Sequence, residues 1–134
     1  MKRITSAEAK KLNQDFVKTR SKAIKKAIGK NDALSSWFSI DELKNFISDV
    51  EKEGKDKGIT VNGIRVYFGA YPKEDKDKKK DNMSTVFLVP TKPYAGSMQK
   101  DGVDEGDEGG NDIEELGGVN KGSQGIPPDS EYPQ

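Results

Sequence analysis

The sequence predicts an α+β protein: two helices packed on a small antiparallel β-sheet, with a disordered acidic C-terminal tail. Three observations support this fold class. Residues 64–71 alternate between two kinds of side chain with the period of two that is typical of a strand. Two earlier segments carry apolar residues at three- and four-residue spacing, which is typical of helices. After Tyr94 the composition changes to Gly, Asp and Glu with few apolar residues.

The first helix is expected over residues 5–28. Thr5 and Glu8 have the spacing of a capping box, and Gly29 is suited to the position just past the helix end. At about 100° per residue, one face collects the apolar stripe, and the face nearly opposite collects lysines. The expected stripe consists of Ala9, Leu12, Phe16, Ala23 and Ala27.

The second helix is expected over residues 40–57. Ser39 and Glu42 again have capping-box spacing. The apolar residues Ile40, Leu43, Phe46, Ile47 and Val50 follow at helical spacing. The helix should fade after Val50, because Gly54 lowers helix propensity and Gly58 ends the pattern.

Strands are expected at about 59–71 and 84–91, joined by the charged loop 73–82. They most simply form an antiparallel pair, and we expect Phe68 to share a buried face with Ile64 and Val66. Asn62-Gly63 is either a two-residue turn that pairs 59–61 with 64–66 or a bulge within one strand. The tolerance of Asn-Gly for positive φ favours the turn.

These elements place a single small domain at residues 1–95 and the tail at 96–134. The whole chain of 134 residues is 31% hydrophobic and 34% charged, which is near the polar limit for a globular protein. Its net charge of zero hides a segregation. Residues 1–30 carry ten basic and two acidic residues, whereas 101–134 carry one basic and ten acidic residues. Such a distribution indicates self-contact or oppositely charged partners.

Several functional classes are disfavoured by the residues that the chain lacks. It has no Cys and no His, which removes disulfides, the usual zinc ligands and the commonest general base. The acidic tail fails the spacing of a calcium-binding EF-hand loop, and no phosphate-binding glycine motif is present. We therefore expect no cofactor and no metal. The N-terminus lacks an apolar leader and no segment is long enough for a membrane span, so a cytoplasmic location is expected.

Two groups of side chains are candidate binding surfaces. The first, called the lysine face below, consists of Lys11, Lys18, Lys22 and Lys25 on the first helix. It would meet an anionic partner, such as phosphates, anionic lipid or the chain's own tail; the alternative is an ordinary solvated helix face. The second is a polar–aromatic patch of Arg65, Tyr67 and Tyr71 on one face of the main strand. The favoured alternative is that these three residues pair laterally across strands.

Three segments carry a resemblance: 63–72 (GIRVYFGAYP), 84–91 (STVFLVPT) and 37–47 (WFSIDELKNFI). With them the chain resembles a group of small uncharacterised bacterial proteins of the Bacteroidetes type. The resemblance covers roughly residues 35–95 and implies the helix–strand–strand core and a bacterial origin. It implies no activity.

The function that these observations favour is a non-enzymatic, cytosolic protein-binding or adaptor module whose partner is another protein. The alternative is a nucleic-acid-associated protein that uses the lysine face, with the acidic tail acting as an autoinhibitory mimic. A small enzyme without His or Cys chemistry is the third hypothesis, because Asp41 and Glu42 are already explained by helix capping. Whether the tail carries a linear binding motif stays open.

Overall fold

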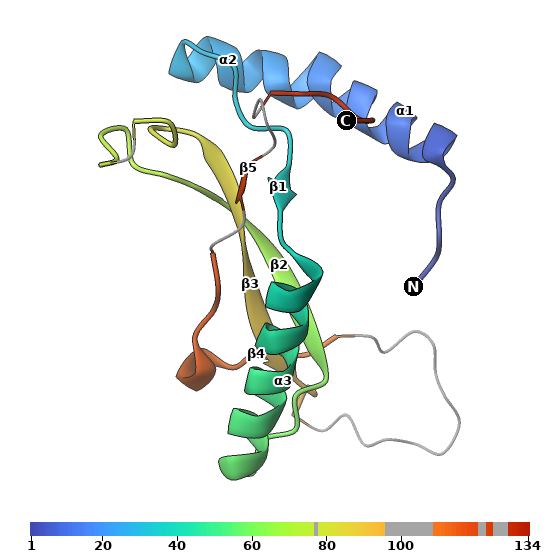
Figure 1. Ribbon diagram of the computed structural model, residues 1–134, viewed down its shortest axis with the longest axis vertical. Coiled ribbons are helices and arrows are strands. Elements are labelled where there is room, and N and C mark those ends of the chain that lie inside the picture. The colour runs from blue at the N-terminus through green and yellow to red at the C-terminus, as the bar shows by residue number, and fades with distance from the viewer. Residues whose placement is uncertain (77, 96–108, 121–122, 125–128) are drawn as a thin grey trace. The chain divides into compact units, whose positions relative to one another are not determined.

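The computed structural model describes residues 1–76, 78–95, 109–120, 123–124 and 129–134, and it shows an α+β fold (Figure 1). The chain divides into two compact units. One holds Met1–Trp37, Phe68–Thr85 and the described residues from 123 onward, and the other holds Phe38–Tyr67 and the described residues of 86–120. Each unit is described by itself.

The N-terminal helical segment begins and ends where its capping residues predict. It consists of α1 (Ser6–Phe16), a π-helical segment η1 (Val17–Ser21) and α2 (Lys22–Ile28). Thr5 and Glu8 form the capping box, which lowers the pKa of Glu8 through the hydrogen bond from the Thr5 backbone N–H. Gly29 ends the segment at φ 77°, a left-handed conformation that glycine adopts without strain.

The packing of this helical segment differs from the sequence prediction. Leu12 is 63% exposed and Phe16 is 36% exposed, and Ala23 and Ala27 are also exposed, so most of the expected apolar stripe faces outward. The partly buried positions, of which Asn13, Val17, Ser21, Ile24 and Ile28 form one row, lie on a neighbouring face of the helix. The π-helical segment has no signature in the sequence. Neither this segment nor the helix on either side of it contains a buried residue.

The second predicted helix is α3 (Ile40–Asp56), which begins at the predicted capping box of Ser39 and Glu42. Hydrogen bonds from Ser39 to the Glu42 carboxylate lower its pKa. The helix does not fade after Val50. Gly54 is buried within it, because a Cβ at this position would lie 2.7 Å from the Ile59 carbonyl oxygen and 2.9 Å from the Val61 side chain. Gly54 therefore allows the chain after α3 to return closely against the helix.

The main sheet has three antiparallel strands in the order β2 (Gly63–Ala70), β3 (Ser84–Lys92) and β4 (Asn111–Asp112). A separate two-stranded sheet pairs β1 (Ser36–Trp37) with β5 (Ser123–Gln124) in antiparallel register. The favoured hairpin turn at Asn62-Gly63 is wrong. Gly63 begins β2 with no positive φ, and the Asn62 N–H donates to the Thr91 carbonyl oxygen at 2.8 Å, so β3 takes the place of residues 59–61 as the pairing partner.

The two faces of β2 are reversed relative to the prediction. Phe68 is 88% exposed and Val66 is 54% exposed, while Arg65 and Tyr67 on the opposite face are partly buried. The face that carries Tyr67 is the more buried one because it has a partner on the neighbouring strand: the Tyr67 ring stacks on Phe87 of β3 with centroids 5.2 Å apart. Alternation in a sequence separates two faces without showing which one finds such partners.

Residues 109–120 differ from the expected disordered tail. They contain β4 and a 3₁₀ turn, η2 (Glu114–Leu116), and Ile113 is fully buried. The glycines here mark close contacts: a Cβ at Gly110 would clash with the Lys92 carbonyl oxygen, and one at Gly118 would lie 2.7 Å from the Leu88 carbonyl oxygen. The tail predicted at 96–108, 121–122 and 125–128 lies outside the described residues.

The described core consists of small groups of buried side chains. In the unit that contains α3, these are Val50, Leu88, Pro90 and Ile113. In the other unit, Ala33 and Met83 are buried together with Asp32, whose carboxylate accepts hydrogen bonds from both the backbone N–H and the hydroxyl of Ser84. Within the described residues, no helix combines the length and apolar character needed to cross a membrane.

Candidate functional site

Arg65 and Tyr67 of the predicted polar–aromatic patch are engaged within the chain. Arg65 Nη1 lies 2.5 Å from Asp112 Oδ1, and its Nη2 donates to the Gly110 carbonyl oxygen at 2.6 Å. The Tyr67 hydroxyl donates to the other oxygen of the Asp112 carboxylate. The pKa of Arg65 is raised by its side-chain hydrogen bond with Tyr67 and by the negative charge of Asp112. These contacts hold the described segment 109–112 against β2. The side chains of Arg65 and Tyr67 therefore have a structural role within the chain.

Tyr71, the third residue of the predicted patch, makes different contacts. The Thr85 hydroxyl donates to the Tyr71 hydroxyl at 3.4 Å, and Lys80 Nζ lies 5.5 Å from the centroid of the Tyr71 ring. Arg65 and Tyr67 therefore share Asp112, whereas Tyr71 has other partners, and each of the two tyrosines contacts a side chain of β3. The other face of β2 is the more open surface.

The edge of β2 that faces away from β3 is unpaired among the described residues, because β2 is the outer strand of its sheet (Figure 1). The Tyr71 N–H donates to the Met83 carbonyl oxygen at 2.9 Å, which places the odd-numbered backbone groups of β2 toward β3; Asn62, whose N–H also faces β3, precedes the strand. By the alternation of an antiparallel ladder, Ile64, Val66 and Phe68 direct their N–H and C=O groups toward the open edge. We call this edge, with the side chains of Ile64, Val66, Phe68 and Ala70, the β2 edge.

Two features that commonly protect an outer strand are absent from Gly63–Ala70. Natural outer strands commonly carry a proline or an unpaired charge that prevents another strand from adding to the sheet. Gly63–Ala70 contains no proline, and its one charged residue, Arg65, is paired with Asp112. Phe68 and Val66 are largely exposed on it. The β2 edge is therefore chemically suited to an additional strand.

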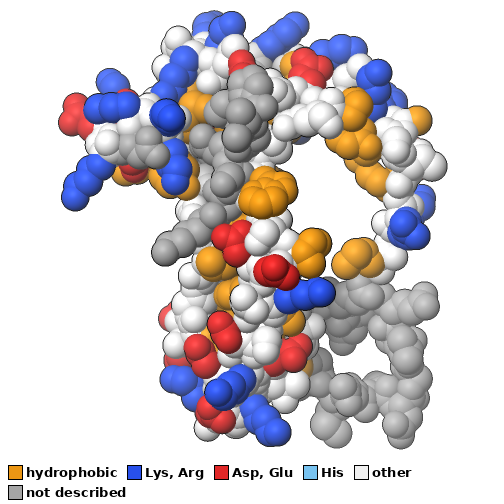
Figure 2. All heavy atoms as spheres, in the orientation of Figure 1, with side chains coloured by type: hydrophobic (Ala, Val, Ile, Leu, Met, Phe, Trp, Pro, Cys, Tyr) orange, Lys and Arg blue, Asp and Glu red, His pale blue; other side chains and the backbone are white. Residues whose placement is uncertain are grey.

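The lysine face lies on α1, η1 and α2, and its four members are exposed (Figure 2). Lys11 Nζ forms an exposed ion pair with Asp15 at 3.3 Å, one helical turn away. Figure 2 shows Lys and Arg side chains gathered over this helical segment. The positive charge of the lysine face is therefore exposed, and its role in binding stays a prediction.

The C-terminal segment of residues 129–134 lies along the same helical unit. Asn31 Nδ2 donates to Asp129 Oδ2 at 2.8 Å, and the Tyr132 N–H donates to Asn13 Oδ1 at 3.0 Å. An open cleft of about 330 Å³ lies here. The side chains that line it include Ser21, Lys22, Lys25, Asn31, Asp32, Asp129 and Glu131. Acidic residues from the C-terminus therefore share a cleft with two members of the lysine face.

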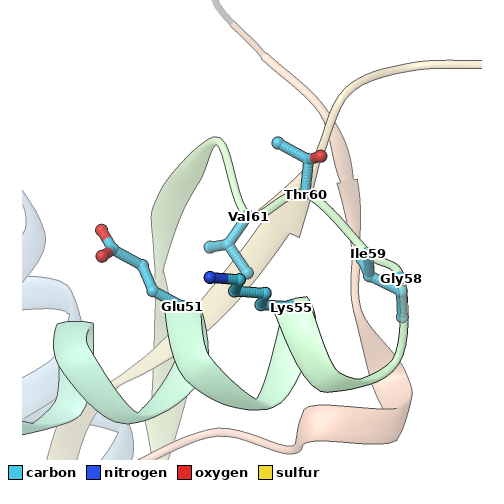
Figure 3. A pocket seen from close by; sticks show the side chains of 6 residues that line it. All are labelled: Glu51, Lys55, Gly58, Ile59, Thr60 and Val61. Carbon is cyan, nitrogen blue, oxygen red and sulfur yellow. The ribbon is translucent and has the colours of Figure 1, made fainter.

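A second open cleft, of about 410 Å³, lies at the C-terminal end of α3 (Figure 3). Figure 3 shows Glu51 and Lys55 rising from the helix, with Thr60 and Val61 in the chain that follows it. Among the described residues that line this cleft, the ionisable ones are Glu51 and Lys55. They lie four residues apart on a helix, where an ordinary surface pair explains them. This cleft suggests no reaction.

Neither cleft contains the set of groups that an active site requires. A nucleophile needs a base within hydrogen-bond reach and a third group that orients the base. The described residues contain no such set, and no group of three or more carboxylates among them could hold a metal ion. A comparison with protein-family models, curated proteins and solved structures found no match. The resemblance to small bacterial proteins stays a prediction.

Proposed function

We propose that this chain is a non-enzymatic protein-binding or adaptor module that takes an extended partner strand at the β2 edge. One observation carries the proposal: an outer strand with outward Val66 and Phe68, 54% and 88% exposed, and no unpaired charge. Backbone hydrogen bonds from the edge would supply affinity, and the exposed side chains would select apolar residues at alternate positions of the partner. The cytoplasmic location expected from the sequence is part of this proposal.

A display library of extended peptides, selected on the full chain at low concentration, tests this function. Peptides that use the β2 edge should lose most of their affinity for a Phe68→Lys variant, because the new charge would have to be desolvated on strand addition. A Leu12→Lys variant is the matched control, since Leu12 is an exposed apolar residue on α1. If the selected peptides bind both variants equally, the β2 edge is not the binding surface.

A second candidate function is favoured by the C-terminal segment. Asp129 and Glu131 share a cleft with Lys22 and Lys25, which is the arrangement expected if the acidic segment occupies a surface for polyanions. Under this candidate the lysine face would bind nucleic acid through phosphate contacts, and the C-terminal segment would compete for it.

A further inference from the structure

We infer that the partner strand at the β2 edge is β2 of a second copy of this chain, so that two copies join their sheets in antiparallel fashion. This inference rests on the proposed function and names its partner. The outward backbone groups of β2 belong to alternate residues, which is the pattern that a two-fold axis requires of a self-complementary strand.

The side chains of the β2 edge complement themselves when the strand is reversed. With the two-fold axis at Val66, each Val66 faces its counterpart, and Phe68 of one copy lies opposite Ile64 of the other. Aromatic and β-branched side chains are a favourable cross-strand pair. Phe68, 88% exposed in the single chain, would be covered at both ends of the shared ladder.

The charges on β2 also favour a second copy. In this register Arg65 would lie opposite Tyr67 of the other copy, so the two arginines do not oppose each other. Arg65 is already paired with Asp112 in its own chain. A strongly acidic or basic peptide would have no charge of opposite sign to meet on the exposed face of Gly63–Ala70. An uncharged apolar strand meets no such penalty, and β2 itself is one.

The expected dimer is weak. An aromatic side chain buries about 150–250 Å² when fully covered, so two copies of Phe68 with their smaller neighbours supply several hundred Å². Stable interfaces bury about 1,200 Å² or more, so association should depend on protein concentration. Sedimentation equilibrium of the full chain should show a mass that rises from 14.7 kDa toward twice that value as concentration increases.

Two variants separate the β2 edge from other routes to association. Phe68→Lys should keep the mass of a single chain at every concentration tested, while Leu12→Lys should dimerise as the unaltered chain does. Both positions are exposed, so both variants should fold, which circular dichroism checks. A chain that stays monomeric throughout, or a Phe68→Lys variant that dimerises normally, overturns the inference.

A cross-linking experiment tests the geometry directly. The chain has no cysteine, so Val66→Cys introduces a single reactive thiol at the proposed axis. A short bis-maleimide should join two copies of this variant and should leave Leu12→Cys largely as single chains. Equal cross-linking of the two variants overturns the inference. The peptide selection described above is read at low concentration and does not require self-association, so it judges the proposed function separately.

Discussion

Tyr67 and Phe68 are adjacent aromatic residues on β2 whose side chains have opposite surroundings. Tyr67 stacks on Phe87 and donates a hydrogen bond to Asp112, whereas Phe68 is 88% exposed. Truncation of Tyr67 would remove its ring contacts and would leave the Asp112 carboxylate without one hydrogen-bond donor. Truncation of an exposed side chain removes few contacts and so changes stability little. The adjacent pair therefore tests which face of the strand is inward.

We expect Tyr67→Ala to lower the free energy of unfolding by about 2–3 kcal/mol, below the range for fully buried aromatic residues because Tyr67 is only partly buried. Phe68→Ala should change it by less than about 1 kcal/mol. Urea unfolding of the two variants, at protein concentrations low enough to avoid association, measures the difference. A larger loss for Phe68→Ala would show that the apolar side chains of β2 face the core.

At the level of single residues, the sequence predicts contacts between residues close in the chain, such as helix caps, but not contacts between residues far apart in the chain. Both capping boxes and the terminating Gly29 were read from the sequence, because each depends on residues within four positions of one another. The partner of Arg65 and Tyr67 is Asp112, 45 or more positions away. No periodicity links these residues, so the Asp112 cluster could not be found from the sequence.

At the level of elements, β4 and the turn after it contribute a buried residue that composition concealed. Ile113 is fully buried, and its N–H donates to the Pro90 carbonyl oxygen at 3.0 Å. The glycines and acids around it are typical of disordered segments by composition. Here Gly110 and Gly118 permit close approach to β3 instead, and Asp112 pairs with Arg65. Composition averages over a window and therefore cannot detect one well-placed isoleucine.

Ile113→Ala should lower the free energy of unfolding by about 2–5 kcal/mol, the range for a fully buried aliphatic side chain. Truncation after Ala95 should cost at least as much, because it removes Ile113 together with Asp112. Chemical denaturation of both variants at matched salt measures the effect, with Glu114→Ala as an exposed control in the same segment. Unchanged stability in the truncated chain would show that residues 1–95 form a complete domain, as the sequence predicts.

At the level of the whole chain, the segregation of charge is the feature most directly readable from the sequence. Most of the basic first thirty residues lie in one helical segment, Ser6–Ile28, which has an exposed lysine face. The described acidic residues near the C-terminus lie in the same unit. Both charged ends follow directly from the order of residues in the chain. The contacts of Asn31 with Asp129 and of Asn13 with Tyr132 were not predictable, because each depends on where the chain returns.

If the C-terminal segment competes for the lysine face, neutralising its acids should increase binding of generic duplex DNA. Asp129→Asn with Glu131→Gln removes two charges from the cleft that contains Lys22 and Lys25. The gain should be several-fold at low salt and should shrink as salt rises, because screening lengths fall to about 8 Å near physiological ionic strength.

Glu51→Gln with Glu53→Gln on α3 gives the same change in net charge at two residues that do not line this cleft. DNA titrations of the two double variants at two salt concentrations measure the gain, and changing Lys11, Lys18, Lys22 and Lys25 to glutamine should abolish it. Equal binding by the two double variants would mean that net charge alone is responsible and that the C-terminal segment has no inhibitory role.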